Sequence, residues 1–290
     1  MTNKWIHRIL SFPLTRILLG MAGMFIPLLL VNNVLLKPVL GLLPISEEIA
    51  RVIRFAILTP LFMYAYIWYF GKVEKRKITE WTWNGMFRES TVGFLVAFTA
   101  LSIPVLILIA IDSYEISLVN IPFYRLLYPL AILFFLAFTE EIFFRGIVYR
   151  ILEESLGTPF ALILSASLFT VMHLTNDFTT VWSTLSVFIG GILLGACFRI
   201  SGRLWLPSFA HLGWNFAQIF WGLNVSGLDK FGEYSPLVAT GYGSDLMTGG
   251  GFGPESSIIT ILSNTLISAF LIIYLYRMDR IIKPFWNREA

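Results

Sequence analysis

Long apolar runs, separated by short basic or polar stretches, dominate the chain. Eight of them are predicted to be helical spans, at residues 17–36, 55–73, 90–111, 126–151, 155–176, 178–198, 204–228 and 256–276. A helix that crosses a bilayer needs about 20 mostly apolar residues. The pattern therefore predicts an all-α, polytopic membrane protein with about eight transmembrane helices in one bundle, forming a single integral membrane domain over residues 1–290.

Composition places this bundle in a lipid bilayer. Hydrophobic residues make up 57% of the chain and charged residues only 13%, whereas a soluble domain usually carries about 25% charged residues. The net charge of +3 is too small for a nucleic-acid-binding surface, so no nucleic-acid partner is expected. One cysteine, Cys197, excludes an internal disulfide framework and a cysteine-rich metal site.

Lysine and arginine are distributed unevenly among the connections between spans. With the N-terminus placed inside, 16 of the 21 Lys and Arg residues fall in cytoplasmic segments and 5 in outer segments. Because cytoplasmic loops are enriched in these residues, we expect a multi-pass protein of the cell membrane with cytoplasmic N- and C-termini. The first apolar run follows a basic tail but is long and lacks a small-x-small cleavage site, so we interpret it as a retained anchor.

The longest connection covers residues 224–255 and ends in the sequence Gly-Gly-Gly-Phe-Gly-Pro-Glu at 249–255. Its glycines exclude a regular helix. We expect an outer or partly re-entrant loop, and the sequence assigns no role to it.

Polar residues inside apolar spans are functional candidates, because burying a charge in the bilayer costs several kcal/mol. Glu140 and Glu141 are followed by Arg145, which lies four residues after Glu141 and hence on the same helix face. We expect Arg145 to neutralise Glu141. Glu140 is turned about 100° away and is expected to remain free to act as a base.

Two further pairs with the same i, i+4 spacing occur in later spans. They are Phe169 with His173, and His211 with Asn215. A rise of 1.5 Å per residue places Glu140 and His173 each about 22 Å along their helices, provided that the fourth helix runs to about Glu154. The three clusters are thus predicted to converge in the cytoplasmic half of the bundle. Taken singly, each cluster could be a helix-packing contact, but the convergence of all three favours a functional site.

In this order and spacing, the three clusters resemble the CAAX protease and bacteriocin-processing family of intramembrane proteases, also called the Abi or CPBP family. The family pattern is Glu-Glu-x-x-x-Arg, then Phe-x-x-x-His, then His-x-x-x-Asn, each on a transmembrane helix, and the chain matches it without departure. The matching residues lie within about 125–225, which we expect to be the catalytic-core helices. Outside this region the resemblance is only in helix count.

The resemblance implies an endopeptidase that hydrolyses a peptide bond near the membrane, similar to a type II CAAX endopeptidase. By the family pattern, Glu140 helped by His173 would activate water, and His211 with Asn215 would stabilise the oxyanion. The implied supporting residues are Glu141, Arg145 and Phe169. The substrate would be a peptide or membrane protein, of CAAX type or bacteriocin-like, and the sequence does not choose between these.

Metal dependence is open at this stage. Glu140, His173 and His211 could supply the three protein ligands that catalytic zinc normally takes, but the spacing His-Glu-x-x-His is absent. We favour catalysis without a metal and keep zinc as the alternative. Two other functions compete with the protease: a non-catalytic membrane immunity or scaffold protein of the same family, and a proton-coupled transporter that uses the two glutamates as its relay.

Overall fold

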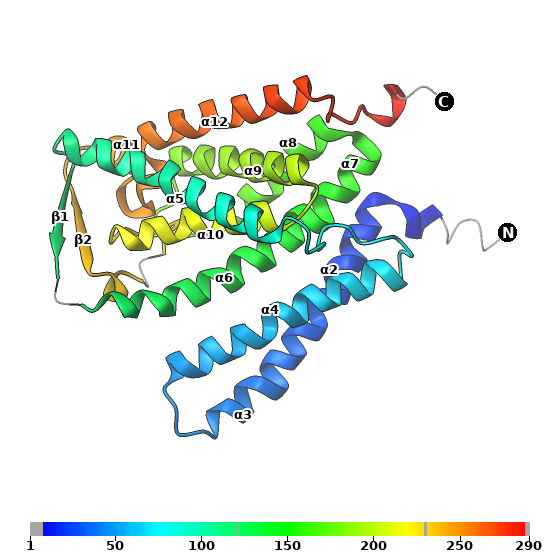
Figure 1. Ribbon diagram of the computed structural model, residues 1–290, viewed down its shortest axis with the longest axis horizontal. Coiled ribbons are helices and arrows are strands. Elements are labelled where there is room, and N and C mark those ends of the chain that lie inside the picture. The colour runs from blue at the N-terminus through cyan, green and yellow to red at the C-terminus, as the bar shows by residue number, and fades with distance from the viewer. Residues whose placement is uncertain (1–7, 120, 229–230, 288–290) are drawn as a thin grey trace.

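The computed structural model describes residues 8–119, 121–228 and 231–287. Figure 1 shows a bundle of helices from which a pair of long N-terminal helices extends at one side. The longer helices are α2 (Pro13–Leu30), α4 (Glu47–Lys72), α5 (Met86–Ala110), α6 (Leu127–Glu141), α8 (Thr158–His173), α9 (Val181–Ser201), α10 (Trp205–Phe220) and α12 (Ile258–Arg277). Shorter helical segments are η1 (Val31–Leu36), α3 (Lys37–Gly41), η2 (Phe123–Leu126), η3 (Ile142–Tyr149), α7 (Arg150–Leu156), η4 (Gly232–Tyr234), α11 (Asp245–Thr248), η5 (Gly250–Phe252), η6 (Pro254–Ser256) and η7 (Phe285–Asn287).

Within the described residues, six helices are long and apolar enough to cross a membrane. This confirms the all-α membrane bundle and a multi-pass protein. The other two predicted spans, at 155–176 and 204–228, fold as the 16-residue helices α8 and α10. Each is about 24 Å long at 1.5 Å per residue, which is shorter than the roughly 30 Å of a hydrocarbon core. Eight full spans are therefore not confirmed.

One continuous helix places the glutamates at the middle of a span. Segments η2, α6, η3 and α7 join into a helical stretch of 34 residues, Phe123–Leu156. The expectation that this helix continues to about Glu154 is thus confirmed. Glu140 lies 17 residues after its start and 16 before its end, so the carboxylates are remote from both ends of the helix.

The predicted helix over 204–228 is wrong at its C-terminal end. Helix α10 ends at Phe220, and Gly222 follows with φ of 70°. A Cβ on Gly222 would lie 2.1 Å from the Leu237 carbonyl oxygen, so the chain turns there against the later segment. The apolar run continues past this turn because Trp221 and Leu223 pack against Val105, Leu108 and Tyr114, which apolar periodicity alone does not reveal.

A two-stranded antiparallel sheet caps the end of the bundle opposite the termini (Figure 1). Strand β1 (Tyr114–Leu118) pairs with β2 (Leu237–Gly241), with Tyr114 opposite Gly241. The sequence analysis predicted no strands. The partners are more than 100 residues apart, so a local pattern could not indicate their pairing.

Helices α5 and α10 approach each other closely through glycines. A Cβ on Gly213 of α10 would lie 2.3 Å from the Phe94 carbonyl oxygen, and one on Gly93 of α5 would lie 2.6 Å from the Leu206 carbonyl oxygen. Small residues of this kind allow membrane helices to pack with their backbones in contact. Gly213 lies between His211 and Asn215, so this contact fixes the position of the third motif.

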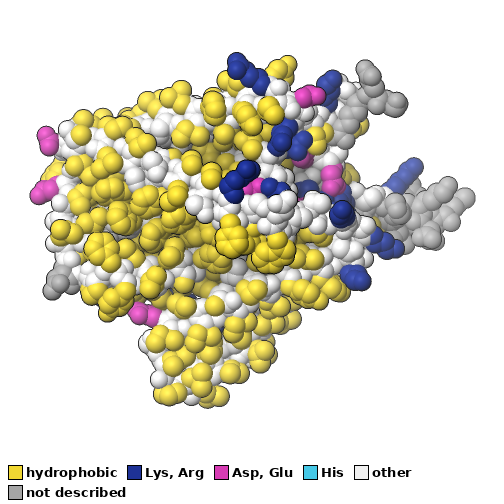
Figure 2. All heavy atoms as spheres, in the orientation of Figure 1, with side chains coloured by type: hydrophobic (Ala, Val, Ile, Leu, Met, Phe, Trp, Pro, Cys, Tyr) yellow, Lys and Arg dark blue, Asp and Glu magenta, His cyan; other side chains and the backbone are white. Residues whose placement is uncertain are grey.

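Basic side chains gather at the end of the bundle where both described chain ends lie (Figure 2). The same end holds the connection between α4 and α5 and the end of α7 (Figure 1). The positive-inside tendency supports the prediction that this end faces the cytoplasm. The orientation itself stays a prediction.

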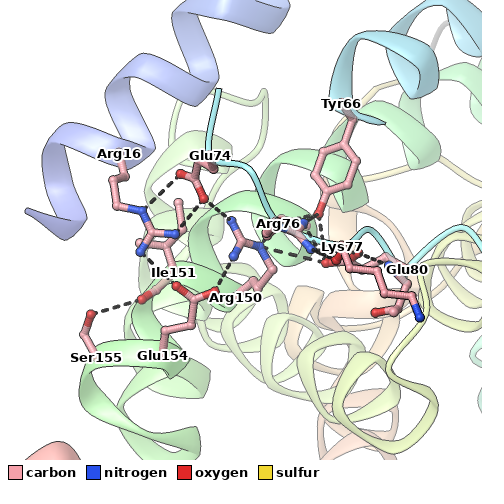
Figure 3. A network of polar contacts seen from close by, with 12 residues as sticks. Arg16, Tyr66, Glu74, Arg76, Lys77, Glu80, Arg150, Ile151, Glu154 and Ser155 are labelled. Atoms are coloured by element: carbon pink, nitrogen blue, oxygen red, sulfur yellow. Dashed lines mark hydrogen bonds and ion pairs between the residues drawn. The ribbon is translucent and has the colours of Figure 1, made fainter. Parts of the chain in front are cut away.

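A network of ion pairs joins three segments at this basic end (Figure 3). Arg16 of α2 binds Glu74 at 2.6 Å and Glu154 at 2.8 Å, and Arg150 of α7 lies 3.4 Å from Glu74. Beside them, Arg76 pairs with Glu80 at 2.8 Å. The network ties the first helix to the long helix that carries the glutamate pair.

Glu74 is expected to make the stability of this end depend on pH. Burial would raise the pKa of Glu74, but the Arg16 hydrogen bond and the Arg150 charge outweigh it and lower the pKa from 4.5. A lowered folded-state pKa gives stability that is present above the unfolded value and lost as the pH falls through the folded one.

Replacing Glu74 with glutamine should therefore destabilise the purified protein at pH 7 by about 0.5–1 kcal/mol after solvent screening. The gap between variant and wild type should close below pH 4.5. Melting curves from pH 3 to 7 measure this. An equal gap at pH 3 and pH 7 would contradict the assignment.

Candidate active site

The two adjacent glutamates have different environments. They end α6, directly before the π-helical segment η3, and such wider helical turns occur frequently at functional sites. The Glu140 side chain is 32% exposed, whereas that of Glu141 is fully buried. The chain therefore presents one carboxylate to the surroundings and encloses the other.

Glu141 forms the ion pair that its spacing predicts. Arg145 Nη1 donates to Glu141 Oε1 at 2.6 Å, and Arg145 Nη2 donates to the Gly191 carbonyl on α9 at 3.0 Å. Arg145 also lies over the ring of Phe169, 5.0 Å from its centroid. The buried arginine thus connects the long helix to both α8 and α9.

His211 makes a contact that the sequence analysis missed. Its Nδ1 lies 2.9 Å from Glu141 Oε1, and its Nε2 lies 3.9 Å from Glu140 Oε2. A carboxylate paired with arginine can only accept, so His211 Nδ1 must carry a proton and donate it. Glu141 therefore orients His211 as well as pairing with Arg145, and the imidazole stands between the two glutamates.

His173 is oriented by its own helix. Its Nδ1 lies 2.8 Å from the Phe169 carbonyl oxygen, which can only accept, so the proton lies on Nδ1 and the neutral ring keeps a free lone pair on Nε2. The Phe169 ring lies 4.4 Å from that of His173 and 5.9 Å from that of His211, between centroids. Phe169 thus packs against both histidines.

A cavity of about 60 Å³ opens beside these rings. This exceeds the roughly 15 Å³ that one water needs. Among the predicted site residues, its lining includes Phe169, His173, His211 and Asn215. Glu140 adjoins it through His211 and is not part of the lining, and the described contacts include none between Glu140 and His173.

The sequence analysis also missed an acidic side chain that lines the cavity, Glu255. Its Oε2 accepts from Trp214 Nε1 at 2.9 Å and from Gln218 Nε2 at 3.3 Å. Trp214 and Gln218 lie three and seven residues after His211, on the same face of α10. The polar positions that continue from His211 along this face of α10 could have indicated a longer polar site. Nothing in the sequence, however, connects them to Glu255 at the end of the glycine-rich segment.

The predicted zinc ligands are not arranged as a coordination set. Within the described parts of the chain, no three His, Cys, Asp or Glu side chains form a group that could hold a metal ion. Both histidines use Nδ1 in internal hydrogen bonds, and the only described contact between two of the three candidates is the 3.9 Å approach of His211 to Glu140. We therefore derive no chemical step through a metal.

Comparison with known families matches the segment that carries all three motifs. Residues 122–217 match a family model described as type II CAAX prenyl endopeptidase Rce1-like. The similarity to the Rce1-like family thus covers about a third of the chain. No curated protein and no solved structure matches the chain.

The Rce1-like segment runs from η2 into α10 and so includes the glutamate pair and both histidines. The resemblance inferred from the motifs is thereby confirmed for this part of the chain. The Rce1-like family implies a CAAX-type intramembrane protease, which would act on peptide or membrane-protein substrates within the bilayer. Helices α2, α4, α5 and α12 lie outside the matched residues.

Proposed function

We propose that the protein is an intramembrane endopeptidase in which Glu140 is the general base. The observation that carries the proposal is the unequal glutamate pair: Glu141 is buried and bound by Arg145 and His211, whereas Glu140 is accessible with His211 at 3.9 Å. A general base must reach the water that it deprotonates. His211, whose Nε2 lies 3.9 Å from Glu140 Oε2, also lines the cavity, which has room for a water.

In the proposed reaction, Glu140 takes a proton from water while the water oxygen attacks the carbonyl carbon of the scissile peptide bond. The carbonyl oxygen then carries a negative charge. As the C–N bond breaks, Glu140 returns the proton to the departing nitrogen, which leaves as an amine beside a new carboxylic acid. Protons and charges balance without any further reactant.

The hydrogen bonds of the two histidines favour different roles. His173 donates through Nδ1 to a carbonyl, so its neutral ring offers Nε2 as an acceptor that assists water activation. His211 donates through Nδ1 to Glu141, so it can donate through Nε2 to an oxyanion only as an imidazolium. The Glu141 carboxylate, which accepts from Nδ1, stabilises that charge. The Asn215 amide, which also lines the cavity, supplies a second donor.

The direct test is cleavage by the purified protein in proteoliposomes. Two sets of peptides with the same hydrophobic body are offered: one ends in a prenylated CAAX sequence and the other is unprenylated and internal. Mass spectrometry should detect defined new peptide termini from at least one set. Absence of cleavage in both sets, together with substrate-driven proton flux, would instead support the transporter.

A scaffold role is distinguished by complementation. If Glu140→Gln fully restores the phenotype of a deletion strain, the protein acts without the proposed base. We expect instead that the variant inserts into the membrane but does not complement.

Catalysis is proposed to be independent of metal, because Glu140 and the oriented histidines supply every proton transfer and donor that the reaction requires. Cleavage by protein dialysed against EDTA or 1,10-phenanthroline should stay within about twofold of the untreated rate, which is under about 0.5 kcal/mol. Elemental analysis of the same preparation is the control. Stoichiometric zinc with chelator-sensitive turnover would contradict this proposal.

A further inference from the structure

A second set of polar side chains lines the cavity, away from the glutamate pair. It consists of Ser226, Glu255 of η6 and Asn264 of α12, which we name the acceptor pole. Glu255 is 6% exposed and Asn264 is 2% exposed. All three lie beyond residue 217, outside the Rce1-like segment.

The carboxylate of Glu255 is held by uncharged donors. Trp214 and Gln218 donate to Oε2, and Ser226 Oγ donates to Oε1 at 2.6 Å. A carboxylate has about four acceptor positions, so one position remains. In the described residues, no basic side chain pairs with Glu255.

Asn264 adds an acceptor that lacks a partner. Its Oδ1 is buried and accepts no hydrogen bond from the described residues. A buried polar atom without a partner costs free energy that a ligand donor would recover. The cavity lining therefore includes an unneutralised carboxylate and a buried amide oxygen without a partner, and both can accept from a ligand donor.

The spacing along α10 sets the distance between the acceptor pole and the reacting groups. Trp214 and Gln218, which bind Glu255, lie three and seven residues beyond His211, or about 5–10 Å along the helix axis. An extended peptide advances about 3.5 Å per residue. The acceptor pole thus faces a substrate side chain about one to three residues from the bond next to His211.

We propose that the acceptor pole selects substrates with a lysine or arginine about one to three residues from the scissile bond, a proposal that rests on the protease function proposed above. The cationic group donates to the open position on Glu255 and to Asn264 Oδ1. A carboxylate at the same place meets the charge of Glu255 and is rejected. The acceptor pole thereby acts in specificity, apart from the chemistry at Glu140.

A purely structural role for Glu255 makes a different prediction. Its backbone carbonyl accepts from Ser186 Oγ, and its side chain ties η6 to α10. A glutamine can keep these bonds, because its amide oxygen accepts from Trp214 and Gln218 while Ser226 Oγ accepts from its NH₂ group. Glu255→Gln removes the charge and leaves the anchor, so it separates the two roles.

The test uses the full-length protein in proteoliposomes and a peptide mixture digested from a proteome, with cleavage sites read by mass spectrometry. Quenched decapeptides that carry lysine, norleucine or glutamate at the preferred position then give kcat/KM. The wild type should favour lysine over norleucine by about tenfold or more. Glu255→Gln should reduce this ratio to within about twofold, with the norleucine peptide cleaved at nearly the wild-type rate.

Glu115→Gln on β1 is the matched control, because Glu115 is exposed at the same end of the bundle and its described contact is with Tyr242. It should keep the wild-type ratio. An unselective wild type, an unchanged ratio in Glu255→Gln, or an equal fall for both peptides would overturn the proposal.

A binding measurement separates this proposal from the proposed function. Fluorescent lysine and norleucine decapeptides are titrated onto Glu140→Gln and onto Glu140→Gln/Glu255→Gln. Glu140→Gln should bind the lysine peptide about tenfold more tightly than the norleucine peptide, and the double variant should lose this difference. That outcome supports the acceptor pole even if the wild type cleaves no peptide. Absence of cleavage alone would reject only the protease function. Equal affinities of both peptides for Glu140→Gln would overturn the acceptor pole even if cleavage is found.

Discussion

Glutamine at position 140 is expected to lower kcat/KM for peptide cleavage by about 10²–10⁴-fold, which is the usual contribution of a general base. Glutamine keeps the size of the side chain but cannot take a proton from water. Stability should change little, because Glu140 is 32% exposed and its described polar contact is the 3.9 Å approach to His211. The melting temperature should therefore stay within about 2 °C of the wild-type value.

The assay is cleavage of one quenched peptide by equal amounts of inserted protein, with melting curves on the same samples. Glu115→Gln, at an exposed position on β1, serves as the charge-removal control and should cleave normally. Full activity in Glu140→Gln would reject the mechanism, and a large loss of stability would show that Glu140 has a structural role.

Breaking the Glu141–Arg145 pair is expected to have the largest effect on stability. Both side chains are at most 1% exposed. Removing one partner of a buried ion pair typically lowers the free energy of unfolding by about 3–5 kcal/mol, because the other charge is left uncompensated. Arg145→Leu should therefore lower the yield of folded protein and the melting temperature sharply. Glu141→Leu should do the same and also release His211.

The double variant Glu141→Leu/Arg145→Leu should recover part of the stability, because it leaves no unpaired charge of the pair in the interior. It should not recover activity, since His211 then lacks the acceptor that orients it. Unfolding curves in a denaturing detergent measure the first effect and peptide cleavage the second. A single variant as stable as the wild type would contradict the structural role of the pair.

Local patterns predicted the features of this protein that depend on neighbouring residues. Apolar runs indicated the helices, and the i, i+4 rule placed Arg145 beside Glu141, as the structure shows. The three motifs were sufficient to indicate the family that the comparison confirms for residues 122–217. The roles of Glu140, His173, His211 and Asn215 stay predictions that only activity can test.

The features that the sequence did not reveal join distant segments. His211 and Glu141 are 70 residues apart, and Trp214 and Glu255 are 41 apart. No periodicity encodes such contacts, because they arise only when helices pack. The same reason explains the missed β1–β2 pairing and the early end of α10, where Gly222 turns the chain against Leu237.

The buried ion pair has a consequence for how a substrate reaches the cavity. Glu141 binds His211 on α10, and Arg145 binds the Gly191 carbonyl on α9. The buried ion pair therefore holds the long helix, α9 and α10 together. Segment η6, in contrast, is tied to α10 only by uncharged donors to Glu255 among the described contacts of that side chain. We expect η6 to move away from α10 when a substrate enters the cavity. A covalent cross-link between η6 and α10 should therefore block cleavage.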